Sequence, residues 1–139
     1  MKTITPFLLK FALTALILTI IFRYFLSYGI ENKSSIIITF SAIIYGVSMF
    51  ISGWIFGKKD GEYLPIFDVG FRFHLTTYLI HNIISELWFI FGFNSHYEKI
   101  GTIHSTAIIW GIFLIIHFIF FLWARKNSIN NLNKEDLFE

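Results

Sequence analysis

The residues best suited to chemistry gather on one stretch of the chain, at positions 73–93. At about 100° per residue of an α-helix, polar side chains fall within one half of this stretch, and leucine and isoleucine dominate the other half. The polar half contains His74, Thr77, Tyr78, His81, Asn82, Ser85 and Glu86. The fit is imperfect, because Leu75, Phe89 and Phe93 also fall in it. Groups that bind protons, ions or small polar ligands therefore share one helix face.

Glu86 is the one carboxyl in this stretch. In an apolar environment a carboxyl must pair with a cation, accept strong hydrogen bonds or stay protonated. We therefore place a candidate site around His81, Asn82 and Glu86 that handles a proton, an ion or a small polar ligand. The competing interpretation is that the same groups only hold helices together.

Two other apolar stretches carry groups that can face this site. Between positions 36 and 56, hydroxyl side chains recur at helical spacing as Ser41, Tyr45, Ser48 and Ser52. Between positions 102 and 123, the same spacing aligns Thr106, Trp110, Phe113 and His117. The full candidate set is Tyr45, Ser48, Tyr78, His81, Asn82, Ser85, Glu86 and His117.

Depth along the helices limits which of these groups can meet. With a rise of ~1.5 Å per residue, Glu86 and Tyr45 lie near one level, and Tyr78 and His117 lie near another. We expect the pairs Glu86–Tyr45 and Tyr78–His117. Arg23 can reach Glu86 if the first helix packs beside the third.

His81 and His117 also raise the alternative of a membrane haem with two axial histidines, since their depths differ by only roughly 4 Å. No distinctive motif surrounds either residue, so no cofactor is predicted. A metal site is not predicted either, because His74 and His81 lie ~10.5 Å apart along the helix. The chain has no cysteine and no H-E-x-x-H motif.

The composition indicates where such a site would lie. The 139 residues are 55% hydrophobic, 20% aromatic and only 14% charged, with a mean hydropathy of +0.67. An ordinary soluble domain carries roughly 25% charged residues. A disordered chain, a nucleic-acid-binding protein and a disulfide-rich scaffold are excluded by the high apolar content, the net charge of +2 and the lack of cysteine. The chain is predicted to be an integral membrane protein.

Four apolar stretches approach the ~20 residues that a membrane-crossing helix needs. They run about 4–26, 36–56, 73–93 and 102–123. The connections are short, which favours an all-α, up-down-up-down bundle of four transmembrane helices as one domain over 1–123. Residues 124–139 form a short polar tail. Lys10 and Arg23, near the ends of the first stretch, are expected to extend toward the lipid headgroups.

The distribution of lysine and arginine predicts the orientation. One side of the bundle carries eight of these residues: Lys2, Lys10, Lys58, Lys59, Arg72, Arg125, Lys126 and Lys134. The other side carries three: Arg23, Lys33 and Lys99. Both termini, the tail included, are therefore predicted to be cytoplasmic. The simplest location is the bacterial inner membrane.

The leading functional hypothesis is a non-enzymatic, channel- or transporter-like membrane protein. Four helices enclose too little volume for a wide pore, so conduction requires a homo-oligomer. Gly46 and Gly53, and Ala107 and Gly111, offer faces for close helix packing. The alternative is an accessory subunit of a larger membrane complex. A third hypothesis is a redox protein that binds haem or a quinone.

Overall fold

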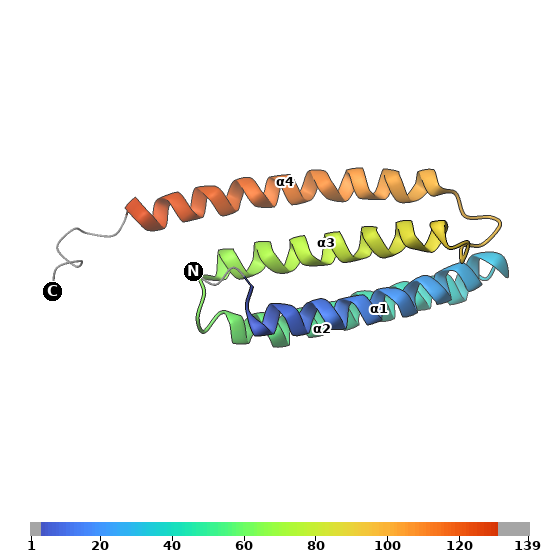
Figure 1. Cartoon of the computed structure of the whole chain (residues 1–139), viewed down its shortest axis with the longest axis horizontal. Helices are drawn as coiled ribbons and strands as arrows, with labels where there is room; N and C mark the ends of the chain where they lie inside the picture. The colour runs from blue at the N-terminus through green and yellow to red at the C-terminus, as the bar shows by residue number, and fades with distance from the viewer. Residues whose placement is uncertain (1–3, 131–139) are drawn as a thin grey trace.

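The computed structural model describes residues 4–130 and the side chains up to Asn127. It contains four α-helices: α1 (Pro6–Glu31), α2 (Ser35–Asp60), α3 (Ile66–Ile90) and α4 (Ile100–Asn130). The all-α prediction is confirmed. Successive helices run in opposite directions, so that the α1–α2 and α3–α4 connections lie at one end and the α2–α3 connection lies at the other (Figure 1).

Local sequence signals account for the helix ends. Thr5 caps α1, because its side chain accepts a hydrogen bond from the Leu8 amide and Pro6 occupies the first turn. Ser34 caps α2 in the same way. Pro65 precedes α3, and Gly92 follows it with a φ of +70°, a left-handed conformation that glycine adopts without strain.

Two helices extend beyond the predicted apolar stretches. α3 begins at Ile66, before the predicted start at 73, and α4 continues to Asn130. The first part of the predicted polar tail, 124–130, therefore continues the helix α4. Residues 131–139 of the predicted tail lie outside the described part of the chain.

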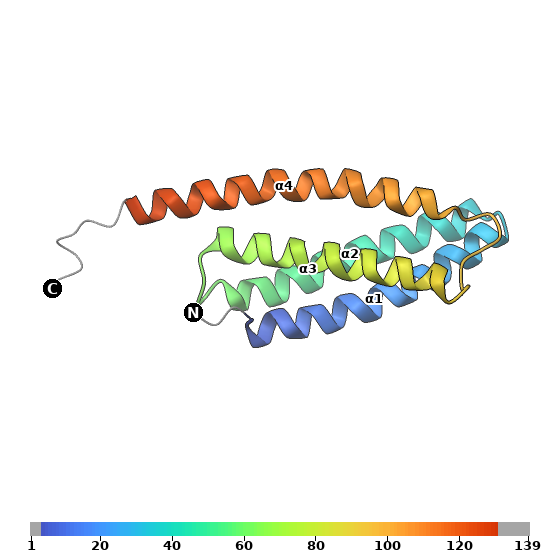
Figure 2. The same cartoon turned by 45° about the horizontal axis from the view of Figure 1, so that its top comes forward.

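The four helices do not form an evenly closed bundle. α1 packs closely against both α2 and α3, whereas α2 and α3 approach each other less. Within residues 4–130, α4 makes close backbone contact with α3 alone (Figure 2). α1 takes the central place because Ala15, Thr19 and Gly29 are small and buried, which lets neighbouring backbones approach it.

The surface of this molecule is more apolar than its interior. The buried core consists of Phe11, Ala15, Val69 and Phe73, and many isoleucine, leucine and phenylalanine side chains are exposed. The buried polar set comprises Thr19, Arg23, Ser27, Ser52, Asp60, Asp68, Ser85 and Ser95. Such a pattern is expected where hydrocarbon, and not water, surrounds the helices.

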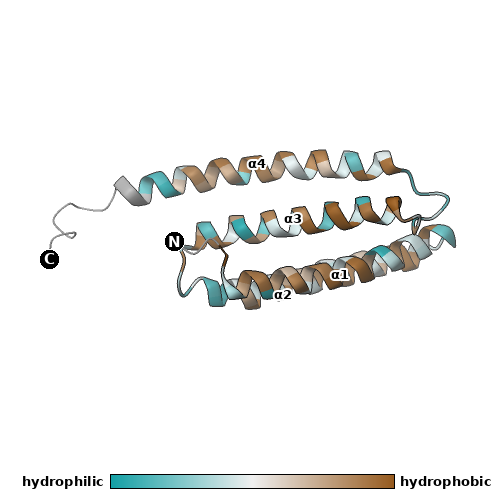
Figure 3. Ribbon diagram, in the orientation of Figure 1, coloured by the Kyte–Doolittle hydropathy of each residue, from teal (hydrophilic) through white to brown (hydrophobic). Residues whose placement is uncertain are grey.

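Three of the described helices, α1, α2 and α4, are long and apolar enough to cross a membrane. α3, which carries Asp68, Arg72 and Glu86, is not among them. Its polar residues alternate with apolar ones along its length, whereas the middle part of α4 is more uniformly apolar (Figure 3). Three of the four predicted spans therefore correspond to helices that are compatible with a membrane in length and composition.

Candidate functional site

A cavity of about 350 Å³ lies among all four helices. α1 contributes Phe22, Arg23 and Leu26, and α2 contributes Tyr45. α3 contributes His81, Asn82 and Ser85, and α4 contributes Thr102, Ile103, Thr106 and Trp110. The cavity thus brings together four of the eight candidate residues: Tyr45, His81, Asn82 and Ser85.

Arg23 is the one charged residue that lines this cavity. We expected its side chain to extend toward the headgroups, and that expectation is wrong: Arg23 is 4% exposed. Its Nη2 donates to Oε2 of Glu98 at 2.6 Å. Glu98 lies in the α3–α4 connection, which folds back over α1 and supplies the negative charge that makes burial of the guanidinium tolerable. The Nε–H of Arg23 has no partner.

Ser85 supplies a second unpartnered group to the cavity. It is 1% exposed, and its hydroxyl makes no hydrogen bond. The neighbouring Asn82 side chain donates to the carbonyl of Tyr78 on its own helix. Buried polar groups are normally paired, so two residues with orphaned donors beside one cavity make it a candidate place for a bound polar molecule.

A chain of hydrogen bonds leads from the cavity to α1. The Thr19 hydroxyl donates to the Ala15 carbonyl at 2.7 Å, so it accepts from the Tyr45 hydroxyl at 3.1 Å. With its proton so used, the Tyr45 oxygen accepts from Nδ1 of His81 at 3.2 Å. In a neutral imidazole this arrangement leaves Nε2 of His81 as an acceptor.

A second polar cluster joins α3 and α4 nearer the other end of the helices. The Trp110 indole N–H donates to Nε2 of His74 at 2.7 Å. His74 therefore carries its proton on Nδ1, which donates to Nδ1 of His117 at 3.0 Å. One arrangement of protons satisfies all three rings, so both histidine tautomers follow from the geometry.

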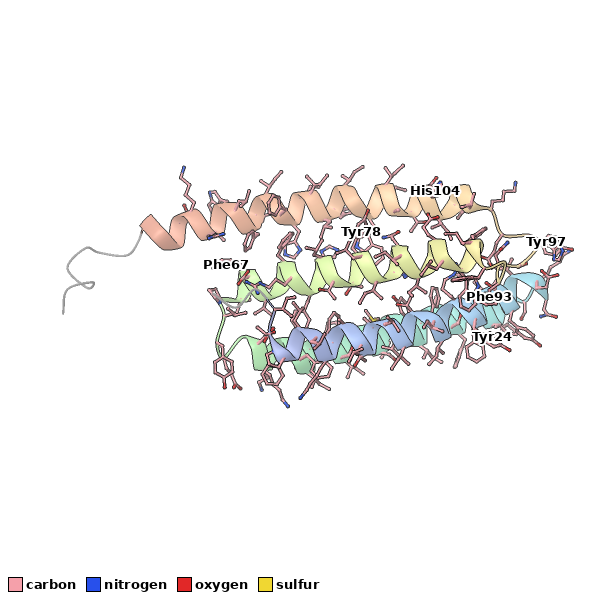
Figure 4. The ribbon with its side chains drawn as sticks, viewed as in Figure 1. Tyr24, Phe67, Tyr78, Phe93, Tyr97 and His104 are labelled. Carbon is pink, nitrogen blue, oxygen red and sulfur yellow. The ribbon has the colours of Figure 1, made fainter. Side chains whose placement is uncertain are left out.

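Two predicted pairs are wrong. Glu86 does not meet Tyr45 or Arg23; it contacts Nε2 of His104 on α4 at 2.9 Å, outside the cavity. His117 pairs with His74, and the Tyr78 hydroxyl donates instead to the Ala107 carbonyl. Tyr78 lies between α3 and α4, and His104 lies on α4 near the α3–α4 connection (Figure 4).

The remaining candidates are dispersed. Ser48 is half-buried on α2 and does not line the cavity. His81 lines the cavity but His117 does not, which separates the two histidines of the haem alternative. Within residues 4–130, no group of three or more histidines and carboxylates is placed to hold a metal ion.

The two glycine faces contribute differently to packing within the chain. A Cβ on Gly46 would meet no atom within 4 Å, so Gly46 makes no close helix contact in this structure. A Cβ on Gly111 would lie 3.2 Å from the Tyr78 hydroxyl, so that this glycine lets α3 and α4 approach within one chain.

The connection that supplies Glu98 is anchored a second time, to the end of α1. Glu31 accepts from the Ser95 hydroxyl at 2.6 Å and from the His96 amide at 3.0 Å. Both hydrogen bonds lower the pKa of the Glu31 carboxyl, and the bond from Ser95 is the larger cause. At ~1.5 Å per residue α1 is ~39 Å long, longer than a bilayer core of ~30 Å, so Glu31 lies beyond the predicted span.

Arg23, Thr19 and Trp110 are not among the site residues that the sequence predicts. The sequence does contain a feature that could have indicated two of them. Arg23 is a charge near the end of an apolar stretch, and Trp110 shares a helix face with Thr106. Thr19 is one of three threonines in the apolar stretch 4–26, and only its contact with Tyr45 distinguishes it from the other two.

A comparison with models of protein families, with curated proteins and with solved structures found no match to this chain. The class of protein therefore rests on the chain itself. Over residues 4–130 it is an all-α protein of four helices, three of which are compatible with a membrane.

Proposed function

We propose that all four helices cross a membrane, most simply the bacterial inner membrane, with both termini on the cytoplasmic side. The polar face of α3 supports this for the helix that is least apolar, because α1 and α4 pack against α3 and Ser85 on that face is buried. The excess of lysine and arginine at the end that holds the α2–α3 connection supports the orientation.

Single cysteines test the orientation cleanly, because the chain has none of its own. Glu62→Cys lies in the α2–α3 connection, and His96→Cys lies in the α3–α4 connection, where the side chain is 93% exposed. A membrane-impermeant maleimide added to intact spheroplasts should label position 96 and not position 62. Labelling of position 62 alone would show that the orientation is the opposite of the proposed one. Labelling of both positions would contradict the proposal that α3 crosses the membrane.

We further propose that the protein is non-enzymatic and binds a small polar ligand, an ion or a proton in the cavity, as a channel- or transporter-like homo-oligomer. One observation carries this proposal. The cavity is lined by all four helices, and two of the residues that line it, Arg23 and Ser85, each carry a buried donor without a partner, Nε and Oγ. A protein that used its polar groups only to join helices would be expected to pair them with each other.

Native mass spectrometry in mild detergent tests this function. The expected result is a homo-oligomer that retains a small molecule or ion. Ser85→Leu, which fills the cavity, should lose the retained mass. Ser41→Leu is the control, because Ser41 bonds to its own helix and lies outside this cavity. An equal retained mass in all three proteins would contradict the proposal.

The accessory-subunit alternative draws on one observation, the exposure of α4. This helix packs closely on α3 alone, and the side chains of Ile108, Phe113 and Trp123 are more than half exposed. The same experiment separates the two functions. A stoichiometric complex with another protein, and no small molecule retained, would favour the subunit function.

A further inference from the structure

We propose that the ligand of the cavity is an uncharged planar ring that bears a carbonyl oxygen, the chemistry of a quinone head group. This inference rests on the proposed function. It narrows the ligand of the same cavity to an uncharged molecule, in place of an ion or a proton. Four features of the cavity support it: the charge balance, the unpaired donors, the aromatic walls and the route of access.

The formal charges at the cavity already cancel. The guanidinium of Arg23 lines it, and the carboxylate of Glu98 neutralises that guanidinium at 2.6 Å. Glu86, the nearest other carboxyl on α3, is engaged with His104 outside the cavity. A charged ligand would therefore be buried without a counter-charge, at a cost of several kcal/mol. The balance favours an uncharged ligand.

The unpaired donors call for an acceptor oxygen. Nε and Nη2 lie on one edge of the guanidinium, and Glu98 occupies only the Nη2 half of that edge. The second oxygen of Glu98 is held at 3.3 Å by the Ser95 amide, so it does not serve Nε. Ser85, which also lines the cavity, carries a second buried donor without a partner. A carbonyl oxygen can accept from either group, because it has two lone pairs.

The walls of the cavity favour a flat ring. Phe22 and Trp110 contribute aromatic surface from opposite helices, and Phe22 stacks on Tyr45 with ring centroids 4.5 Å apart. The volume of about 350 Å³ is at the small end of the range known for ligand pockets, roughly 300–1,000 Å³. A single or fused ring system fits such a space.

The packing of the helices provides a route from the bilayer. α4 makes close backbone contact with α3 alone, so side chains, and not a packed helix pair, separate the cavity from its surroundings between α1 and α4. In a membrane this side meets hydrocarbon. A ligand that dissolves in lipid can enter there without crossing water, as a quinone does and an ion does not.

Binding of 2-methyl-1,4-naphthoquinone to the protein in lipid nanodiscs tests the inference. Quinones quench tryptophan fluorescence, and Trp110 lines the cavity. We expect saturable quenching that is reduced in Trp110→Phe, and empty nanodiscs correct for partition into lipid. Ser85→Ala should weaken binding by about two- to tenfold through loss of one hydrogen bond, and Ser85→Leu should abolish it. Ser52→Ala should bind as the wild type does, because Ser52 bonds to Met49 outside the cavity.

Benzoate and benzylammonium, rings of opposite charge, serve as competing probes. Saturable binding of either one, lost in Ser85→Leu, would overturn the uncharged class while the proposed function stands. The uncharged class would also be overturned, and the proposed function would stand, if the quinone does not bind but Ser85→Leu still removes the retained mass in native mass spectrometry. Quinone quenching that persists in Ser85→Leu would show that the quinone does not bind in this cavity. If no probe binds and Ser85→Leu leaves the native mass unchanged, both proposals fail. Ser85→Ala, with circular dichroism as a check, guards against misfolding of the leucine variant.

Discussion

Arg23 on α1 and Glu98 in the α3–α4 connection, 75 positions apart in the chain, form an ion pair of 2.6 Å whose side chains are 4% and 6% exposed. This pair places a positive charge at the cavity and holds the connection against α1. Glu98 also accepts from the Ser95 amide through its other oxygen, so both carboxylate oxygens of Glu98 are engaged.

Glu98→Gln should destabilise the protein by on the order of 3 kcal/mol, because it leaves the buried guanidinium without its counter-charge. Unfolding in mixed micelles, followed by circular dichroism, measures the change. Glu62→Gln is the matched control, since Glu62 is exposed in the α2–α3 connection, and it should change the free energy of unfolding by less than about 0.5 kcal/mol. Equal effects of the two substitutions would show that the pair does not stabilise the fold.

Trp110→Phe should alter the tautomer of His74. The indole N–H holds Nε2 of His74 as an acceptor, and phenylalanine keeps an aromatic ring but removes this donor. Nitrogen-15 chemical shifts of the His74 ring should report a proton on Nδ1 in the wild type and a mixture in the variant. The loss in stability should be about 0.6 kcal/mol, the average for such bonds in membranes. Trp54→Phe, at an exposed position on α2, should leave the His74 shifts unchanged.

Gly29→Ala and Gly46→Ala should have opposite effects on stability. A Cβ on Gly29 would lie 2.9 Å from the Ile38 side chain and 3.2 Å from the Ile38 backbone nitrogen, so α1 and α2 must separate at a cost of about 1–3 kcal/mol. At Gly46 the same Cβ meets nothing within 4 Å, and alanine should stabilise the helix by about 0.5–1 kcal/mol. Thermal unfolding of both variants measures the difference. A loss of stability in Gly46→Ala would contradict the open environment of this residue.

Acidification should release the Glu31 anchor. Hydrogen bonds from Ser95 and His96 lower the pKa of Glu31 in the folded state. Its contribution to stability is therefore complete above the ordinary pKa of a glutamate and is lost as the pH falls through the lowered value. The difference in unfolding midpoint between wild type and Glu31→Gln should be present at pH 7 and disappear in acid. Ser95→Ala should reduce the same pH dependence, because the serine hydroxyl is the main cause of the shift. A difference that grows on acidification would contradict the assignment.

The candidate site could be predicted from the sequence only in part. The polar face of 73–93 is a matter of local spacing, and it correctly identified His81, Asn82 and Ser85 as neighbours on one helix. Glu86 belonged to the same face by spacing, but it lies at the edge of the polar half. A small rotation of α3 therefore decides whether it meets α1 and α2 or α4, and the structure pairs it with His104.

The helical class, the number of helices and the apolar surface could all be predicted from local sequence patterns. These properties depend on local hydropathy and on turn residues such as Pro65, which act within a few positions. The tertiary structure decided which groups meet: Arg23 with Glu98, Tyr45 with Thr19 and His81, and His74 with His117. Each pairing depends on the rotation and register of two helices. Small buried residues such as Ala15 allow α1 to occupy the centre, and that packing is a property of the whole fold.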